Sequence, residues 1–105
     1  MNSTQDAARV DIVWESHRCR VNPPTVSVSQ EGKVEFFSID VDEATIFFPA
    51  GVAQPPEPQT IRKGSSAVFT ATGPPGSYPY VVFCRREGRP FELAEGHSEP
   101  RMVIR

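Results

Sequence analysis

Residues 73–84 read GPPGSYPYVVFC. The opening glycines and prolines favour a tight turn, because proline fixes φ and glycine accepts backbone angles that other residues rarely adopt. The residues that follow are mainly tyrosine, valine, phenylalanine and cysteine, and β-branched and aromatic side chains of this kind are enriched in strands. A rigid turn followed by an apolar strand is the first indication of an all-β protein.

Short strands recur along the rest of the chain. Val10, Ile12 and Trp14 alternate with Asp11, Val13 and Glu15, the period of two that places one face of a strand in a core. Further strand-sized segments lie at residues 25–29, 34–37, 45–48, 60–62, 67–71 and 102–104. The chain also has 11 prolines and 7 glycines, which supply turns. We therefore predict a Greek-key antiparallel β-sandwich of about seven or eight strands.

The length of 105 residues provides for one core and not for two. Residues 1–7 have no periodic pattern, so we expect a flexible N-terminal tail followed by a single domain at residues 8–105. Residues 50–58 are rich in proline, which cannot join a central ladder, and form a loop. Residues 85–100 are polar and irregular, with one helical turn predicted at residues 91–95.

Four stretches resemble the cupredoxins, a family of small copper-protein domains: residues 21–28, 31–36, 61–69 and 75–80. The last is the most specific, because cupredoxins place a Pro-Gly-x-Tyr-x-Tyr-like turn and strand just before their cysteine ligand. The resemblance covers residues 8–105. It implies a cupredoxin-like sandwich for this chain.

The resemblance also implies where copper ligands would lie, and the set is incomplete. A type 1 site needs two imidazoles, a thiolate and a weak axial thioether. Ala44 stands where the first histidine is expected. The cysteine position falls on Val82 or, two residues later, on Cys84. In either register the second histidine is missing, because Arg85 or Glu87 takes its place.

Cys84, His97 and Met102 remain as candidate ligands for copper, with His17 more remote. The simpler interpretation makes Met102 a core side chain and His97 a loop residue. We therefore expect no cofactor, and keep a copper-binding or electron-transfer protein as the alternative. Cys19 and Cys84 can be two separate buried thiols or a disulfide, and the sequence leaves both open.

A thiol-dependent redox protein or enzyme acting through Cys84 is a second alternative. The nearby cations Arg85, Arg86 and Arg89 would lower the pKa of that thiol. A phosphatase loop is excluded, because Pro90 occupies the position of its essential arginine. A strand cysteine beside valine and phenylalanine is usually a buried apolar side chain, so we expect no enzyme.

The leading hypothesis is a non-enzymatic, metal-free module that contacts a partner protein or small ligand through residues 40–44 and 84–99, because long loops often carry function. The candidate contact residues are Asp40, Asp42, Glu43, Arg85, Arg86 and Arg89. The three acids lack the fixed pattern of a calcium loop, which leaves them as a solvated turn.

The net charge of −2 argues against nucleic acid as a partner. The longest apolar run is too short to span a membrane. We expect a monomer, although exposed sheet edges permit a dimer. The polar N-terminus has no signal-like core, which predicts a cytoplasmic protein, or a periplasmic or secreted one if a leader has been removed.

Overall fold

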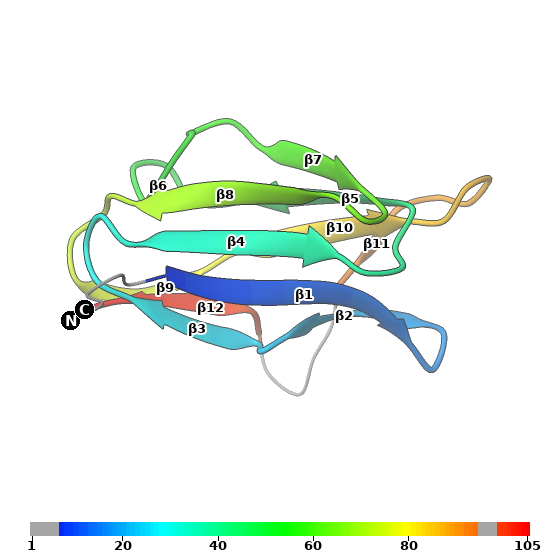
Figure 1. The fold of residues 1–105 in the computed structure, drawn as a ribbon, viewed down its shortest axis with the longest axis horizontal. Coiled ribbons are helices and arrows are strands. Elements are labelled where there is room, and N and C mark those ends of the chain that lie inside the picture. The colour runs from blue at the N-terminus through cyan, green and yellow to red at the C-terminus, as the bar shows by residue number, and fades with distance from the viewer. Residues whose placement is uncertain (1–6, 95–98) are drawn as a thin grey trace.

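The computed structural model describes residues 7–94 and 99–105. This part of the chain forms twelve strands and no helix (Figure 1), which confirms the all-β prediction. The strands are β1 (Ala7–Glu15), β2 (Arg18–Asn22), β3 (Thr25–Val28), β4 (Lys33–Ser38), β5 (Glu43–Phe47), β6 (Ala53–Gln54), β7 (Gln59–Arg62), β8 (Ser66–Ala71), β9 (Gly76–Pro79), β10 (Val81–Arg85), β11 (Glu92–Leu93) and β12 (Arg101–Ile104). The number exceeds the predicted seven or eight because β2 and the two-residue strands β6 and β11 were not predicted and one predicted strand is divided.

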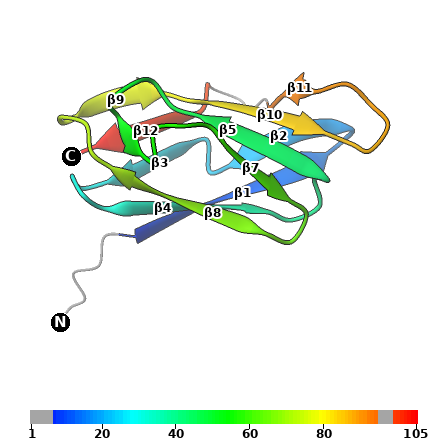
Figure 2. The ribbon, with the colours of Figure 1, turned by 90° about the horizontal axis from the view of Figure 1, so that it is seen from above.

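The strands form a five-stranded sheet of order β2-β1-β4-β8-β6, a four-stranded sheet of order β11-β10-β5-β7 and a three-stranded sheet of order β3-β12-β9. Figure 2 shows β10 and β5 on one side of the sandwich and β4 and β8 on the other. Most pairs are antiparallel, but β1 pairs with β4, and β12 with β3, in parallel. The predicted strand at residues 78–84 is divided at Tyr80, whose backbone N–H donates to the Pro100 carbonyl instead.

The core lies between the inner faces, where alternate residues of strands such as β4, β5 and β10 are buried. The rings of Phe36, Phe48, Phe69 and Tyr80 pack together there, with neighbouring ring centroids 4.9–5.9 Å apart; four of the five ring pairs are edge to face and the pair of Phe48 and Tyr80 is tilted. Such aromatic pairs add to the free energy gained by burying apolar area. The period-two pattern of the sequence therefore identifies the buried faces.

The sequence pattern does not predict β2, which pairs with β1 as a hairpin. Its two turn residues, Ser16 and His17, have φ values of 52° and 69°. Two-residue hairpins need positive φ at this place, and Asn-Gly is the usual signal for it. Ser-His gives no such signal, so the hairpin is visible only in the structure.

Two predicted boundaries also change. The helical turn expected at residues 91–95 is wrong over residues 92–93, which form β11 and pair with β10. This pairing gives hydrogen-bond partners to backbone groups on the edge of β10. The strand β1 begins at Ala7, within the predicted tail, and residues 1–6 and 95–98 lie outside the described residues. The described residues contain no helix that is long and apolar enough to cross a membrane.

Candidate functional site

Three connections meet at the end of the sandwich that contains Cys84: the β1–β2 hairpin, residues 38–42 between β4 and β5, and the β10–β11 hairpin. Cys84 faces inward from β10 and is fully buried. Directly across from it on β5 is Ala44, also fully buried. The register therefore places a methyl group beside the cysteine, at the position where the family resemblance implies an imidazole.

The sulfur of Cys84 is bonded to that of Cys19. The two residues are 65 apart in sequence, and their Cα atoms are 6.4 Å apart. Cys19 is fully buried on β2, in the five-stranded sheet, whereas Cys84 belongs to the four-stranded sheet. The disulfide therefore links the two layers of the sandwich through its core, and it answers the pairing question that the sequence leaves open.

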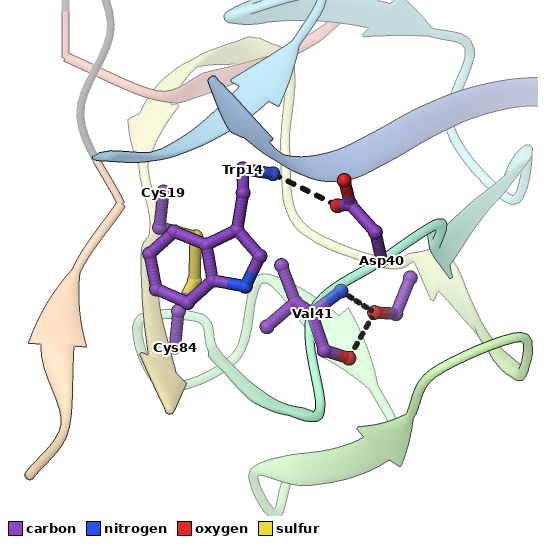
Figure 3. Close-up of a disulfide and its surroundings, with 6 residues drawn as sticks. Trp14, Cys19, Asp40, Val41 and Cys84 are labelled. Carbon is purple, nitrogen blue, oxygen red and sulfur yellow. Dashed lines mark hydrogen bonds between the residues drawn. A yellow bond between two sulfur atoms is a disulfide. The ribbon is translucent and has the colours of Figure 1, made fainter. Parts of the chain in front are cut away.

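Trp14 covers this disulfide from the end of β1. It pairs with Cys19 across the hairpin, and Figure 3 shows its indole ring in front of the sulfur atoms. Its backbone N–H donates to Oδ1 of Asp40 at 2.9 Å. The guanidinium of Arg86 lies over the ring, 4.2 Å from its centroid, in a cation–π contact. Asp40 and Arg86, both predicted to contact a partner, thus hold the covering tryptophan in place.

Residues 38–42 form a turn with its own buried polar contact. The Ser38 hydroxyl donates to the Val41 carbonyl at 2.7 Å, and the Val41 N–H donates back to Ser38 Oγ at 3.2 Å (Figure 3). Ser38 and Val41 are both fully buried. Since a buried hydroxyl is costly without hydrogen bonds, these contacts allow the turn to pack inside the end of the sandwich.

The remaining predicted contact residues lie in a charged region. Arg85 Nη2 is 2.8 Å from Glu43 Oε1, and Asp42 Oδ2 accepts a hydrogen bond of 2.8 Å from the Glu87 backbone N–H. Arg89 is exposed in the β10–β11 hairpin, where its N–H donates to the Arg86 carbonyl. The predicted acids and arginines thus mainly connect one loop to another.

A pocket of about 310 Å³ opens between these charges. It is lined by Asp42, Glu43, Arg62, Lys63, Arg85 and Glu87. Arg62 and Lys63 are not among the residues predicted from sequence, where they form part of a strand and its turn. Only the pairing of β7 with β5, which sets Arg62 opposite Glu43, brings these two cations to the pocket.

Of the candidate copper ligands that the structure describes, none lies on a strand that pairs with β10. Met102 is fully buried on β12, whose neighbours are β3 and β9 and not β10. His17 is exposed at the tip of the β1–β2 hairpin, and His97 lies outside the described residues.

These residues do not fit a type 1 copper centre. Such a centre needs a thiolate, and the sulfur of Cys84 is part of a disulfide. Ala44 has no atom that can bind a metal. In the described ranges, no group of three or more His, Cys, Asp or Glu side chains is placed to hold a metal ion.

Comparisons with known proteins identify the fold. No family model and no curated protein matches this chain. Among solved structures, amicyanin from Paracoccus versutus (Thiobacillus versutus) is 20% identical, with a TM-score of 0.58 over 99% of this chain and 86% of that one. The reduced Cu(I) form, at pH 4, of a point mutant of amicyanin is 19% identical, with a TM-score of 0.58 over 100% and 86% of the two chains. The chain therefore has a cupredoxin-like fold, which the sequence resemblance predicted.

Proposed function

We propose that this chain is a copper-free, non-enzymatic binding module, which holds an acidic group of a partner or small ligand in the pocket beside β7 and β10. The observation that carries the proposal is the contrast at one end of the sandwich. The sulfur that would bind a metal is closed in a disulfide, while a charged pocket next to it remains open. The cupredoxin-like fold is compatible with this function but does not establish it.

The pocket is lined by three acids and three cations, and an anion is favoured on the side where two of the cations have no ion-pair partner in the described residues. Glu43 is already paired with Arg85, and Asp42 already accepts a hydrogen bond from Glu87 N–H. Within the described residues, Arg62 and Lys63 have no carboxylate at ion-pair distance, and both are exposed. A carboxylate or phosphate group that reaches the pocket can pair with both cations, and Arg62 offers the planar fork that binds such groups best.

Titration with inorganic phosphate and with acetate, followed by NMR of the backbone amides, tests the proposal. We expect saturable shifts at residues 42–43, 62–63 and 85–87, with a Kd in the millimolar range, about −4 kcal/mol. The variant R62S/K63S should lose them. The matched control Lys33→Ser, on the five-stranded sheet, should keep them. Shifts that are equal in all three proteins would overturn the proposal.

The copper alternative has a separate test. Addition of Cu(II) to the oxidised protein should give no intense thiolate-to-copper absorption, because no thiolate is present. After reduction, Ala44 still denies the metal an imidazole beside Cys84. A one-to-one complex with such an absorption, abolished by Cys84→Ala, would replace the binding-module proposal with an electron-transfer function.

The disulfide is also relevant to the cellular compartment in which the protein works. Neither the fold nor the comparisons support the cytoplasmic prediction, whereas a buried disulfide between the layers fits an oxidising compartment. We propose that the protein works outside the reducing cytoplasm. Alkylation of protein taken directly from its native cells, followed by mass spectrometry, should find Cys19 and Cys84 both blocked. Free thiols at both positions would contradict this assignment and reopen the thiol-dependent alternative.

A further inference from the structure

Two β-turns of the same construction lie on opposite sides of the charged pocket. The first spans residues 62–65 between β7 and β8, and the second spans residues 86–89 in the β10–β11 hairpin. In each turn the N–H of the fourth residue donates to the carbonyl of the first, at 2.9 Å and 3.0 Å respectively. The third residue is Gly64 in one turn and Gly88 in the other, with φ values of 79° and 78°. Positive φ at the third position alone is typical of a type II turn, which favours glycine there.

The second residue of each turn is charged, and the two charges have opposite signs. Lys63 occupies this position in the first turn, and Glu87 occupies it in the second. Both residues are exposed, and both line the pocket of about 310 Å³. Because the turns have the same construction, a cation and an anion occupy equivalent positions on the two sides of one pocket.

Asp42 holds both turns from the loop before β5. The Lys63 N–H donates to the Asp42 carbonyl at 3.4 Å, and the Glu87 N–H donates to Asp42 Oδ2 at 2.8 Å. The first turn has a further hydrogen bond of 2.7 Å from the Gly64 N–H to the Ser38 carbonyl. The backbone beneath the two charges is therefore fixed before a ligand arrives, which lowers the cost of ordering the site on binding.

Neither of these charges is neutralised within residues 7–94 and 99–105. Lys63 and Glu87 form no ion pair with each other or with another residue of these ranges. Glu43, on the strand between β7 and β10, is already paired with Arg85. A simple anion can therefore pair only with the cations on the β7 side, whereas a ligand that has both signs of charge can also pair with Glu87.

The spacing of the strands limits the length of such a ligand. Both β7 and β10 pair with β5, and neighbouring strands lie about 4.8 Å apart, so the strands that carry the two turns are separated by about 10 Å. An extended peptide of three residues spans about 10 Å. The pocket volume of about 310 Å³ is at the lower end of the range of small-molecule pockets, roughly 300–1,000 Å³. The ligand that fits is therefore small and extended, with its two charges at opposite ends.

We propose that the pocket binds a small extended zwitterion, such as a peptide of two or three residues with free termini. Its carboxylate pairs with Arg62 and Lys63, and its ammonium group pairs with Glu87. The inference rests on the proposed function, because the carboxylate is the acidic group assigned to this pocket, and it adds the ammonium group at the other end. Ion pairs between exposed charges are weak, so the ammonium group should improve the affinity about two- to fivefold.

A matched pair of ligands tests the role of the ammonium group. Triglycine and N-acetyltriglycine have the same carboxylate, but acetylation removes the positive charge at the other end. In NMR titrations of the backbone amides at about pH 6.5, where the amino group is protonated, triglycine should have a Kd about two- to fivefold lower. The pair 6-aminohexanoate and 6-acetamidohexanoate should behave in the same way if the two charges suffice, and a difference seen only with triglycine would assign the pocket to peptides. Equal Kd values within both pairs would overturn this inference and leave the anion proposal standing, whereas the absence of saturable shifts with all four ligands would overturn both.

A matched pair of variants tests where the ammonium group binds. Glu87→Gln keeps the size of the side chain and removes its charge, so it should abolish the difference between triglycine and N-acetyltriglycine without weakening the binding of N-acetyltriglycine. Glu57→Gln makes the same change at an exposed residue outside the pocket and should keep the difference. The variant R62S/K63S should weaken the binding of both ligands. A difference between the two ligands that persists in Glu87→Gln would overturn the proposal.

Discussion

The outward side of the five-stranded sheet combines ion pairs with single apolar side chains such as Val68, whereas that of the four-stranded sheet carries an apolar face made of Phe47, Val81, Phe83, Phe91 and Leu93. On the first, Arg9 pairs with Asp11 at 2.7 Å and also lies over the ring of Phe37, and Arg20 pairs with Glu15 at 3.1 Å. Both sheets have apolar inward faces. Folding requires only the inward faces to be apolar, so the difference between the outward sides is not a requirement of the fold.

The largest loss of stability is expected for a core side chain, compared with an outward side chain on the same strand. Phe36 and Phe37 are neighbours on β4, but Phe36 is fully buried among the core rings and Phe37 lies outside under Arg9. We expect Phe36→Ala to lower the free energy of unfolding by about 3–5 kcal/mol. Phe37→Ala should lower it by less than about 1 kcal/mol. Urea unfolding measures both, and similar losses would contradict the assignment of faces.

The second-largest loss of stability is expected when the disulfide between the two sheets is removed. We expect the variant C19A/C84A to lose about 2–4 kcal/mol, because the disulfide closes a long loop between the layers and restricts the unfolded chain. Wild-type protein unfolded in the presence of a reductant is the control and should show a similar loss. An unchanged unfolding free energy in both would mean that the link contributes nothing to stability.

A smaller difference is expected between the ion pairs of the two outward sides. Arg85 and Glu43 are partly buried beside the apolar face, whereas the pair of Arg20 and Glu15 includes a largely exposed carboxylate. We expect Arg85→Ala to cost about 1 kcal/mol and Arg20→Ala a few tenths. Repeating the unfolding in high salt should reduce the cost at Arg20 in greater proportion, since exposed pairs are screened more. A larger cost at Arg20 would reverse this ranking.

The smallest change in stability is expected for a polar group in the core between the two sheets. Tyr80 is buried, and its hydroxyl has no hydrogen-bond partner in the described residues. Burial raises the pKa of this hydroxyl well above its usual value. In the unfolded chain this hydroxyl ionises near pH 10, whereas in the folded chain it stays neutral. The free energy of unfolding is therefore unaffected by this group below about pH 10 and decreases as the pH rises further.

We therefore expect Tyr80→Phe to be as stable as the wild type at pH 7, or more stable by up to about 1 kcal/mol. Above pH 10 it should lose less stability. Unfolding at pH 7 and pH 11 measures both differences, and Tyr78→Phe, which removes a hydroxyl that donates to the Pro74 carbonyl at 2.6 Å, is the comparison for a hydrogen-bonded tyrosine. A Tyr80→Phe variant that loses stability at pH 7 would point to a hydrogen bond made by this hydroxyl.

Local sequence patterns are sufficient to predict the fold class and the inward faces of the strands. Alternation at Val10, Ile12 and Trp14 and the turn-strand segment at residues 73–84 are local properties, and a strand with a period of two can bury only one side. The family resemblance placed Ala44 where a ligand is expected, and the register sets Ala44 directly opposite Cys84. These inferences succeed because each needs only short stretches of chain.

Contacts between strands that are distant in the sequence are visible only in the tertiary structure. The link between Cys19 and Cys84 and the meeting of Arg62 with Glu43 depend on which strands become neighbours, and spacing along the chain does not specify that. The apolar run at Val81, Val82 and Phe83 does not show by itself which of its side chains are buried. Only the arrangement of the sheets buries Val82 and leaves Val81 exposed.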